Sequence, residues 1–281
     1  MGEDLKIWTI SKILNWAVTE FKKNSISSPK QNAETLIAHT LNIKRLDIYL
    51  LLDKEISGTQ LEAIMNIVSR RNIHEPLQYI LGETEFYGYK IKVNKNVLIP
   101  RPETELLVEK IIHDEKNINS ILDIGTGSGA IAIALAKNLN SVLIEATDIE
   151  NEALIIAKQN ATFNCVDINF HKSDIFSDVL GTYDLIISNP PYISQKDYDQ
   201  LPIEIKDFEP KSALQADDNG LTFYDKILQK AKEHLTESGK IYFEIGYDQA
   251  KMITQIAKKY GFSDIQVFKD LNSFDRIMRI I

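Results

Sequence analysis

Two short motifs in this sequence carry groups that could do chemistry. The first is Asp123-Ile124-Gly125-Thr126-Gly127-Ser128-Gly129, which follows an apolar run and opens an apolar helical stretch. The second is Asn189-Pro190-Pro191-Tyr192, which follows the apolar run Leu185-Ile186-Ile187-Ser188. Each motif is predicted at the carboxyl end of a strand, which is where open α/β sheets bind their ligands.

The glycine-rich motif predicts a loop that binds a cofactor through its backbone. Glycines let the main chain approach a ligand closely and adopt conformations that a Cβ disfavours. Asp148, expected at the end of the next strand, lies at the roughly 20-residue spacing from which a carboxylate binds ribose hydroxyls. Because Gly125-x-Gly127-x-x-Ala130 also fits the dinucleotide fingerprint, the loop alone leaves open a nicotinamide or flavin cofactor and S-adenosylmethionine. No glycine loop continues into Gly-Lys-Ser/Thr, which excludes a P-loop nucleotide hydrolase.

The Asn-Pro-Pro-Tyr motif favours methyl transfer. Pro190 has no backbone N–H, and Pro191 restricts Pro190 to an extended conformation. The Asn189 side chain and the Pro190 carbonyl are therefore rigid acceptors for the two hydrogens of a planar –NH2 group, and Tyr192 offers a ring to stack on it. Such a nitrogen is a poor nucleophile because its lone pair is delocalised, so an enzyme must orient it in line with a methyl donor. This chemistry selects S-adenosylmethionine from the two cofactor classes.

Strands and helices alternate around these motifs. Apolar strands are predicted at 121–124, 142–147, 183–188, 240–245, 265–268 and 276–281, with helices at 130–139, 152–161, 221–235 and 247–260. This alternation is typical of an α/β fold, a doubly wound and mostly parallel sheet. The carboxyl ends of parallel strands meet at one edge, so both motifs are expected there.

The chain before this sheet predicts a second, smaller domain. Residues 1–75 are predicted as a small all-helical domain, because apolar residues recur at helical spacing. Ser28-Pro29 predicts one helix start, and Thr59 with Glu62 predicts a capping box at another. Residues 76–99, with Gly82 and Gly88, are predicted as a hairpin-like linker, and residues 100–281 as the sheet domain.

Composition narrows the function classes. The 281 residues carry a net charge of −8, which disfavours stable binding to nucleic acid. No apolar run approaches the ~20 residues of a membrane span. The single cysteine excludes internal disulfides and fits a cytoplasmic location, and the five scattered histidines have no metal-ligand spacing, so no metal is expected.

Further segments extend the pattern beyond the two motifs. They are Pro76–Gly82, Glu85–Gly88, Leu98–Glu105 and Asp207–Pro210. Together with the two motifs they resemble the HemK/PrmC family, the peptide chain release factor N5-glutamine methyltransferases. The resemblance runs from about residue 76 to the carboxyl end, and a helical amino-terminal domain of this size also fits. Ser173 departs from it, since a glycine is usual before the acidic residue at 174.

The resemblance implies a role for each matching residue. Gly125, Thr126, Gly127, Ser128 and Gly129 would line the methionine part of S-adenosyl-L-methionine, Asp148 would hold the ribose, and Asp174 and Ile175 would flank the adenine. Asn189, Pro190, Pro191 and Tyr192 would hold the substrate amide, with Asn189, Pro190 and Tyr192 catalytic and Asn189 also beside the cofactor. The implied substrate is the glutamine of the Gly-Gly-Gln motif of release factors. Residues 1–75 would dock this protein substrate, and we expect a monomer.

Two other functions remain compatible with the motifs. An adenine-N6 or guanine-N2 nucleic-acid methyltransferase also presents an exocyclic amine to Asn-Pro-Pro-Tyr, although the net charge of −8 argues against it. A regulatory module that binds the cofactor without turnover is disfavoured because the donor and acceptor motifs are both intact.

Overall fold

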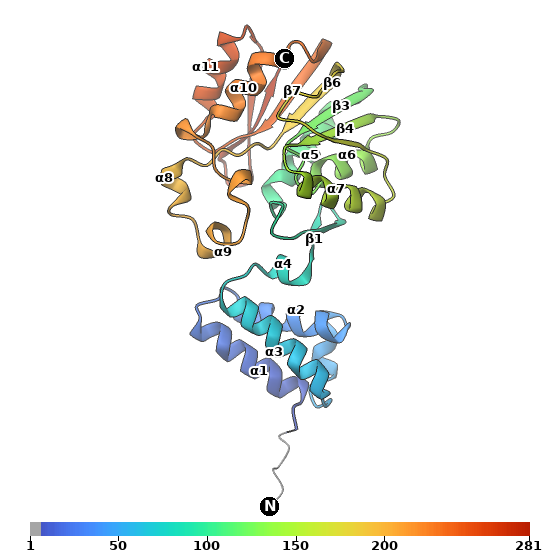
Figure 1. The fold of residues 1–281 in the computed structure, drawn as a ribbon, viewed down its shortest axis with the longest axis vertical. Coiled ribbons are helices and arrows are strands. Elements are labelled where there is room, and N and C mark those ends of the chain that lie inside the picture. Colours follow the sequence, from blue (N-terminus) through green and yellow to red (C-terminus); the bar gives the residue numbers. More distant parts are fainter. Residues whose placement is uncertain (1–6) are drawn as a thin grey trace, which may run out of the picture. The chain divides into compact units, whose positions relative to one another are not determined.

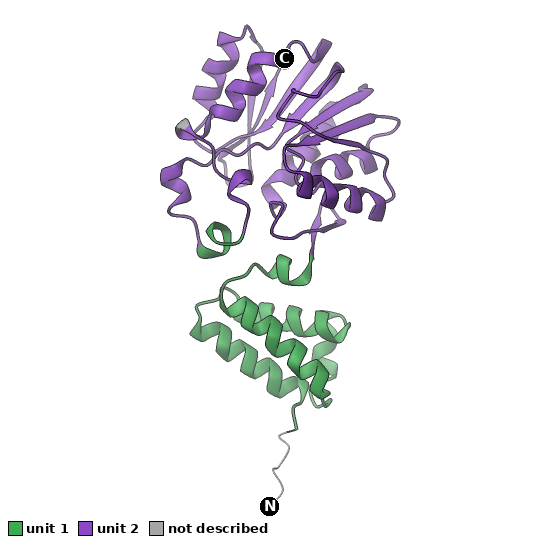
Figure 2. Ribbon diagram, in the orientation of Figure 1, with its two compact units in different colours: residues 1–82, 203–208 green, residues 83–202, 209–281 purple. Residues whose placement is uncertain are grey.

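The computed structural model describes residues 7–281, apart from the side chain of Asp218, and divides the chain into two compact units. One unit comprises the residues up to Gly82 together with Ile203–Phe208, and the other comprises Glu83–Pro202 and Glu209–Ile281 (Figure 2). Residues 1–6 of the predicted helical domain lie outside the described residues. The boundaries at 75 and 99 that the sequence suggests stay a prediction.

The first unit is helical. Its elements are α1 (Ile10–Lys23), α2 (Pro29–Leu41), the 3-10 helix η1 (Arg45–Leu50), α3 (Gly58–Asn72), α4 (Leu77–Leu81) and α9 (Ile203–Lys206). Apolar side chains at helical spacing on α1, α2 and α3 are fully buried against one another, among them Ile13, Phe21, Leu36 and Ile64. The apolar residues that recur at helical spacing in the sequence therefore form the core of this unit.

The helix starts of this unit differ in part from expectation. Pro29 is the first residue of α2 as predicted, although the Ser28 side chain makes no capping hydrogen bond. The capping box predicted at Thr59 and Glu62 is wrong: the N-cap is Ser57, whose Oγ accepts the Gln60 N–H at 3.2 Å, while Gln60 Oε1 accepts the Ser57 N–H at 3.1 Å. The same capping chemistry starts α3 two residues earlier, because Ser57 and Gln60 offer the same donor and acceptor pattern.

A buried arginine attaches α9 to the helical unit. Arg71 on α3 is 2% exposed, and its Nη2 lies 2.6 Å from Glu204 Oε1 on α9. Its Nε donates to Asn32 Oδ1 at 2.8 Å, and its Nη1 donates to the Glu75 carbonyl at 2.9 Å. The guanidinium is thus paired and hydrogen-bonded, which is the condition for burying such a charge. The segment of the chain after Tyr192 in this way supplies one short helix to the helical unit.

The second unit is an α/β sandwich. Its strands are β1 (Glu83–Phe86), β2 (Tyr89–Lys92), β3 (Ser120–Ile124), β4 (Leu143–Asp148), β5 (Asn169–Lys172), β6 (Tyr183–Ser188), β7 (Leu235–Glu244), β8 (Ile265–Lys269) and β9 (Asp275–Ile280). Its helices are α5 (Pro102–Asp114), α6 (Ala130–Asn138), α7 (Asn151–Phe163), α8 (Gln195–Tyr198), α10 (Thr222–Ala231) and α11 (Ala250–Lys259), with 3-10 turns η2 (Lys211–Ala213) and η3 (Asp218–Gly220).

Across the described residues β3 to β9 form one seven-stranded sheet in the order β5-β4-β3-β6-β7-β9-β8. The strands from β5 to β7 are parallel to their neighbours, and β9 is antiparallel to β7 and β8. Helices α5, α6 and α7 lie on one face and α10 and α11 on the other (Figure 1). The predicted fold class, a doubly wound and mostly parallel sheet with a small helical domain, is confirmed.

Some details of the sheet were not expected. Strand β5 was missed, since its four residues include three polar ones, and β7 begins at Leu235, where a helix had been predicted to end. Strands β1 and β2 pair as a hairpin whose two turn residues, Tyr87 and Gly88, both have positive φ angles of 51° and 78°. This is the geometry of a tight turn that matches the twist of the flanking strands.

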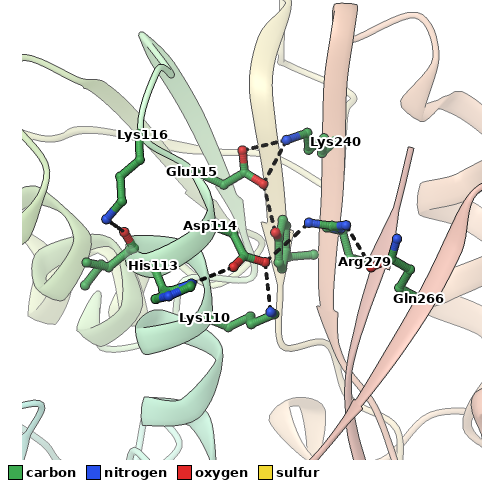
Figure 3. A network of polar contacts seen from close by, with 10 residues as sticks. Lys110, His113, Asp114, Glu115, Lys116, Lys240, Gln266 and Arg279 are labelled. Atoms are coloured by element: carbon green, nitrogen blue, oxygen red, sulfur yellow. Dashed lines mark hydrogen bonds and ion pairs between the residues drawn. The ribbon is translucent and has the colours of Figure 1, made fainter.

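A polar network joins the end of α5 to the middle of the sheet (Figure 3). Glu115, directly after α5, is 4% exposed and accepts hydrogen bonds from Lys240 Nζ at 2.8 Å and from the Tyr242 hydroxyl at 2.8 Å, both on β7. Its neighbour Asp114 pairs with Lys110 at 2.9 Å and with Arg279 of β9 at 3.3 Å. These contacts hold α5 across β7 and β9.

Glu115→Ala is expected to lower the free energy of unfolding by about 1–3 kcal/mol, because the buried Tyr242 hydroxyl loses its acceptor. Chemical denaturation with urea measures this change. Asn117→Ala, two positions further along at an exposed residue outside the network, is the control and should stay within about 0.5 kcal/mol. If the two variants are equally stable, the network does not contribute to holding α5 against the sheet.

Candidate active site

The two motifs line one cavity at the carboxyl edge of the sheet. The cavity has a volume of about 330 Å³ and lies where β3, β4 and β6 end. The predicted site residues on its wall are Gly125, Gly127, Asp148, Asp174, Ile175, Asn189, Pro190 and Pro191. Residues far apart in the chain meet here because Ile124 is paired with Thr147 of β4 and with Ser188 of β6 in parallel register.

The glycine loop is held by the strand beside it. Asp148 Oδ2 accepts the Gly127 N–H at 2.8 Å, and its Oδ1 accepts the Glu150 N–H at 2.9 Å. Burial raises the pKa of Asp148, and these backbone donors oppose the rise. Gly127 has a φ of 56°, and a Cβ there would meet no atom within 4 Å, so the loop leaves open space beside its backbone.

The other predicted loop residues lie behind this wall. Gly129 has a φ of 81°, and a Cβ there would come within 3.2 Å of the Ala157 Cβ, so this glycine permits close packing on α7. Thr126 and Ser128 are 8% and 4% exposed. The Thr126 hydroxyl donates to Asp123 Oδ2 at 2.7 Å. Burial raises the pKa of Asp123 to about 7, in spite of this hydrogen bond.

The Asn-Pro-Pro-Tyr motif directly follows β6, and hydrogen bonds fix the position of its start. The Ser188 hydroxyl donates to the Ile124 carbonyl at 2.8 Å, which ties the start of the motif to β3. Asn189 Nδ2 then donates to Thr104 Oγ1 of α5 at 3.2 Å. Pro190 is buried and Pro191 half-buried, and both border the cavity with Asn189.

Tyr192 occupies a different place from the other motif residues. It borders a neighbouring groove, together with Ile193, Gln249 and Met252. Its hydroxyl donates to Glu244 Oε1 at 3.3 Å, and burial raises the pKa of Tyr192. The stacking role expected for this ring stays a prediction.

Two further residues belong to this region that the sequence did not single out. Thr104 is 4% exposed and its hydroxyl donates to Glu244 Oε2 at 2.6 Å; Glu244, at the end of β7, is 1% exposed. Burial raises the pKa of Glu244, while the Thr104 hydroxyl and Arg276 oppose the rise. Thr104 lies within the segment Leu98–Glu105 that contributes to the family resemblance, and Glu244 is an acidic residue that interrupts the apolar run Ile241–Ile245.

Among residues 7–281, no three side chains of the kinds that ligate metals gather at one place. Nor does any helix within that range have the length and apolar character needed to cross a membrane.

The fold and the site together define the class of this protein as a methyltransferase. It has a doubly wound sheet, a glycine loop held by the half-buried Asp148, and a rigid Asn-Pro-Pro wall on the same cavity. The chain matches the model of the methyltransferase small domain over residues 102–204 and that of the PrmC N-terminal domain over residues 12–82. A solved methyltransferase from Pyrococcus furiosus has the same fold, with a TM-score of 0.54 and 20% identity over 80% of this chain and 98% of that one.

Sequence relatives specify the family. The chain is 39% identical to a release factor glutamine methyltransferase of Fusobacterium nucleatum, over 95% of this chain and 77% of the relative. It is 35% identical to that of Geobacter sulfurreducens, over 99% of this chain and 98% of the relative. The chain therefore belongs to the family of release factor glutamine methyltransferases, and the resemblance noted in the sequence is confirmed.

Proposed function

We propose that this chain transfers a methyl group from S-adenosyl-L-methionine to the side-chain amide nitrogen of the glutamine in the Gly-Gly-Gln motif of peptide chain release factors. The observation that carries the proposal is the single cavity with the glycine loop and Asp148 on one wall and Asn189, Pro190 and Pro191 on another. A donor and an acceptor bound in that cavity would meet directly. Membership of the family supports the choice of substrate.

The cofactor fits the residues on its side of the cavity. S-adenosyl-L-methionine, when bound, supplies an electrophilic methyl group on a sulfonium. The open space beside Gly127 would accept its methionine part, with Gly125 and Gly129 shaping the loop and Thr126 and Ser128 supporting it from behind. Asp148, which lines the cavity, would hold the ribose hydroxyls, and Asp174 and Ile175 would flank the adenine.

The acceptor side would orient the substrate amide. Asn189 Oδ1 and the Pro190 carbonyl would accept its two N–H hydrogens, and Pro191 keeps this turn rigid. Orientation matters because the delocalised nitrogen lone pair attacks only in line with the methyl group. Transfer would form the new N–C bond as the C–S bond of the methyl donor breaks, and the methylated amide would then lose a proton to water. Tyr192 would stack on the amide plane.

The helical unit would dock the body of the release factor. Three apolar side chains on η1 are exposed: Leu46 by 71%, Tyr49 by 43% and Leu50 by 82%. Neighbouring exposed apolar residues of this kind suit a protein partner. Binding energy remote from the reacting atoms can then be used to orient the glutamine. We expect the chain to act in the cytoplasm as a monomer without stable nucleic-acid binding, in keeping with its charge of −8.

Asp148→Ala should weaken the binding of S-adenosylmethionine by about 1.5–3 kcal/mol, roughly 10- to 100-fold in Kd, because the ribose hydroxyls lose a charged acceptor. Isothermal titration calorimetry measures this affinity. Glu152→Ala, at a nearby exposed carboxylate, is the matched control and should bind normally. Unchanged affinity in Asp148→Ala removes Asp148 from the site, and strong binding of a nicotinamide dinucleotide contradicts the choice of cofactor.

Asn189→Ala should lower kcat with a purified release factor by about 10²–10³, as deleting one preorganised polar group does elsewhere. Its affinity for S-adenosylmethionine should change little, and Asn138→Ala, at an exposed asparagine, serves as the control. Transfer of radiolabelled methyl groups is assayed on release factor, DNA and RNA in parallel. Near-normal turnover in Asn189→Ala would show that the motif is only a stiff turn. Methylation of DNA or RNA in place of release factor by the unaltered chain would overturn the proposed substrate.

Replacing Leu46 and Leu50 together by serine should raise KM for an intact release factor about 30-fold, because two exposed anchors lost at about 1 kcal/mol each weaken binding by about 2 kcal/mol. A short Gly-Gly-Gln peptide lacks the body of the release factor that would bind η1, so it should be methylated as before. Serine at Leu143 and Leu180, which are 78% and 98% exposed in the sheet unit, is the control. An unchanged KM for the intact protein would show that the substrate docks elsewhere.

A further inference from the structure

A line of buried polar contacts runs behind the Asn-Pro-Pro-Tyr motif. Asn189 Nδ2 donates to Thr104 Oγ1 at 3.2 Å, and the Thr104 hydroxyl donates to Glu244 Oε2 at 2.6 Å. The three residues come from the end of β6, from α5 and from the end of β7. Thr104 and Glu244 are 4% and 1% exposed, so water has little access to compete for these hydrogen bonds.

These contacts have a fixed direction. The Thr104 hydroxyl has a single hydrogen, and it donates that hydrogen to the carboxylate of Glu244. The Thr104 oxygen is then left with lone pairs alone and must itself accept. It can therefore face the NH2 end of the Asn189 amide but repels the oxygen end. The amide orientation follows from the carboxylate two contacts away.

The second oxygen of Glu244 is also in use. The Tyr192 hydroxyl donates to Oε1 at 3.3 Å, so one carboxylate accepts from Thr104 on α5 and from the last residue of the motif. The backbone carbonyl of Glu244 accepts the Tyr224 hydroxyl at 2.8 Å. The carboxylate thus connects both ends of Asn-Pro-Pro-Tyr, and the main-chain contact with Tyr224 is separate from this connection.

We propose that Thr104, held by Glu244, is a positioning residue that keeps the Asn189 amide turned with its oxygen available to the substrate. An asparagine amide can rotate by half a turn and present either –NH2 or oxygen to a ligand, at nearly equal cost in an isotropic environment. A substrate –NH2 group needs an acceptor. Thr104 and Glu244 exclude the rotamer that would offer it a donor. This inference rests on the proposed role of Asn189 as the acceptor of the substrate amide.

Thr104→Val replaces the hydroxyl by a methyl group and removes the acceptor for Asn189 Nδ2. We expect kcat for release factor methylation to fall about 10- to 100-fold, the scale of a misplaced catalytic partner, with little change in the Kd of S-adenosylmethionine. Thr104→Ser keeps the hydroxyl and should restore kcat to near the native value. Glu244→Gln leaves one acceptor oxygen for two hydroxyls, so its loss should be smaller than that of Thr104→Val.

Tyr224→Phe is the matched control. It removes a buried hydroxyl that also bonds Glu244, but at the main-chain carbonyl, so it should lower the melting temperature and leave kcat unchanged. Thr104→Val with native kcat, or Thr104→Ser as slow as Thr104→Val, overturns the inference. A native kcat in Glu244→Gln would show that Glu244 does not take part in positioning the Asn189 amide. If the unaltered chain fails to methylate release factor, the proposed function fails instead, and the two failures are thereby distinguished.

Discussion

The pairing of Ile124 with two neighbours is the constraint on which the rest of the site depends. Ile124 lies opposite Thr147 of β4 on one side and opposite Ser188 of β6 on the other. Because these strands are parallel, the next residues along the chain, Gly125, Asp148 and Asn189, lie at the same level at the carboxyl edge of the sheet. The glycine loop, Asp148 and Asn189 are therefore neighbours by register, and no long side chain has to reach across. A slip of the register would separate them and turn buried side chains outward.

Behind this edge the molecule buries acidic groups that serve as acceptors. Asp123, Asp148 and Glu244 each have a pKa raised by burial, and each receives hydrogen bonds from the chain: from Thr126, from Gly127, and from Thr104 with Tyr192. A carboxylate in such surroundings imposes direction on every donor around it, because it offers no hydrogen of its own. The loop and the asparagine are thus oriented by these acceptors, while the cavity is lined by the glycine loop, the two prolines and larger side chains such as Ile149, Ile175 and Phe223.

The sequence predicted what depends on local pattern. Strand periodicity placed both motifs at strand ends, and helical spacing identified the core of the small unit. Contacts between distant residues were missed: Thr104 and Glu244 meet only because α5 packs across β7, and nothing within either segment reports the other. Tyr192 borders the neighbouring groove, and its expected stacking on the substrate amide stays a prediction. The capping box was displaced because Ser57 and Thr59 are both suitable first residues.

The ion pair of Arg71 with Glu204 has a consequence for how this chain could be divided or recombined. Since Ile203–Phe208 belongs to the helical unit, the polypeptide passes between the units at residues 82/83, 202/203 and 208/209. A catalytic fragment beginning at residue 83 would carry six residues whose packing partners had been deleted, with Glu204 deprived of its arginine. Exchange of amino-terminal domains between homologous genes would likewise succeed only if this internal hexapeptide were exchanged as well. The helical unit is therefore built from two separate stretches of the sequence, and neither stretch alone contains the whole unit.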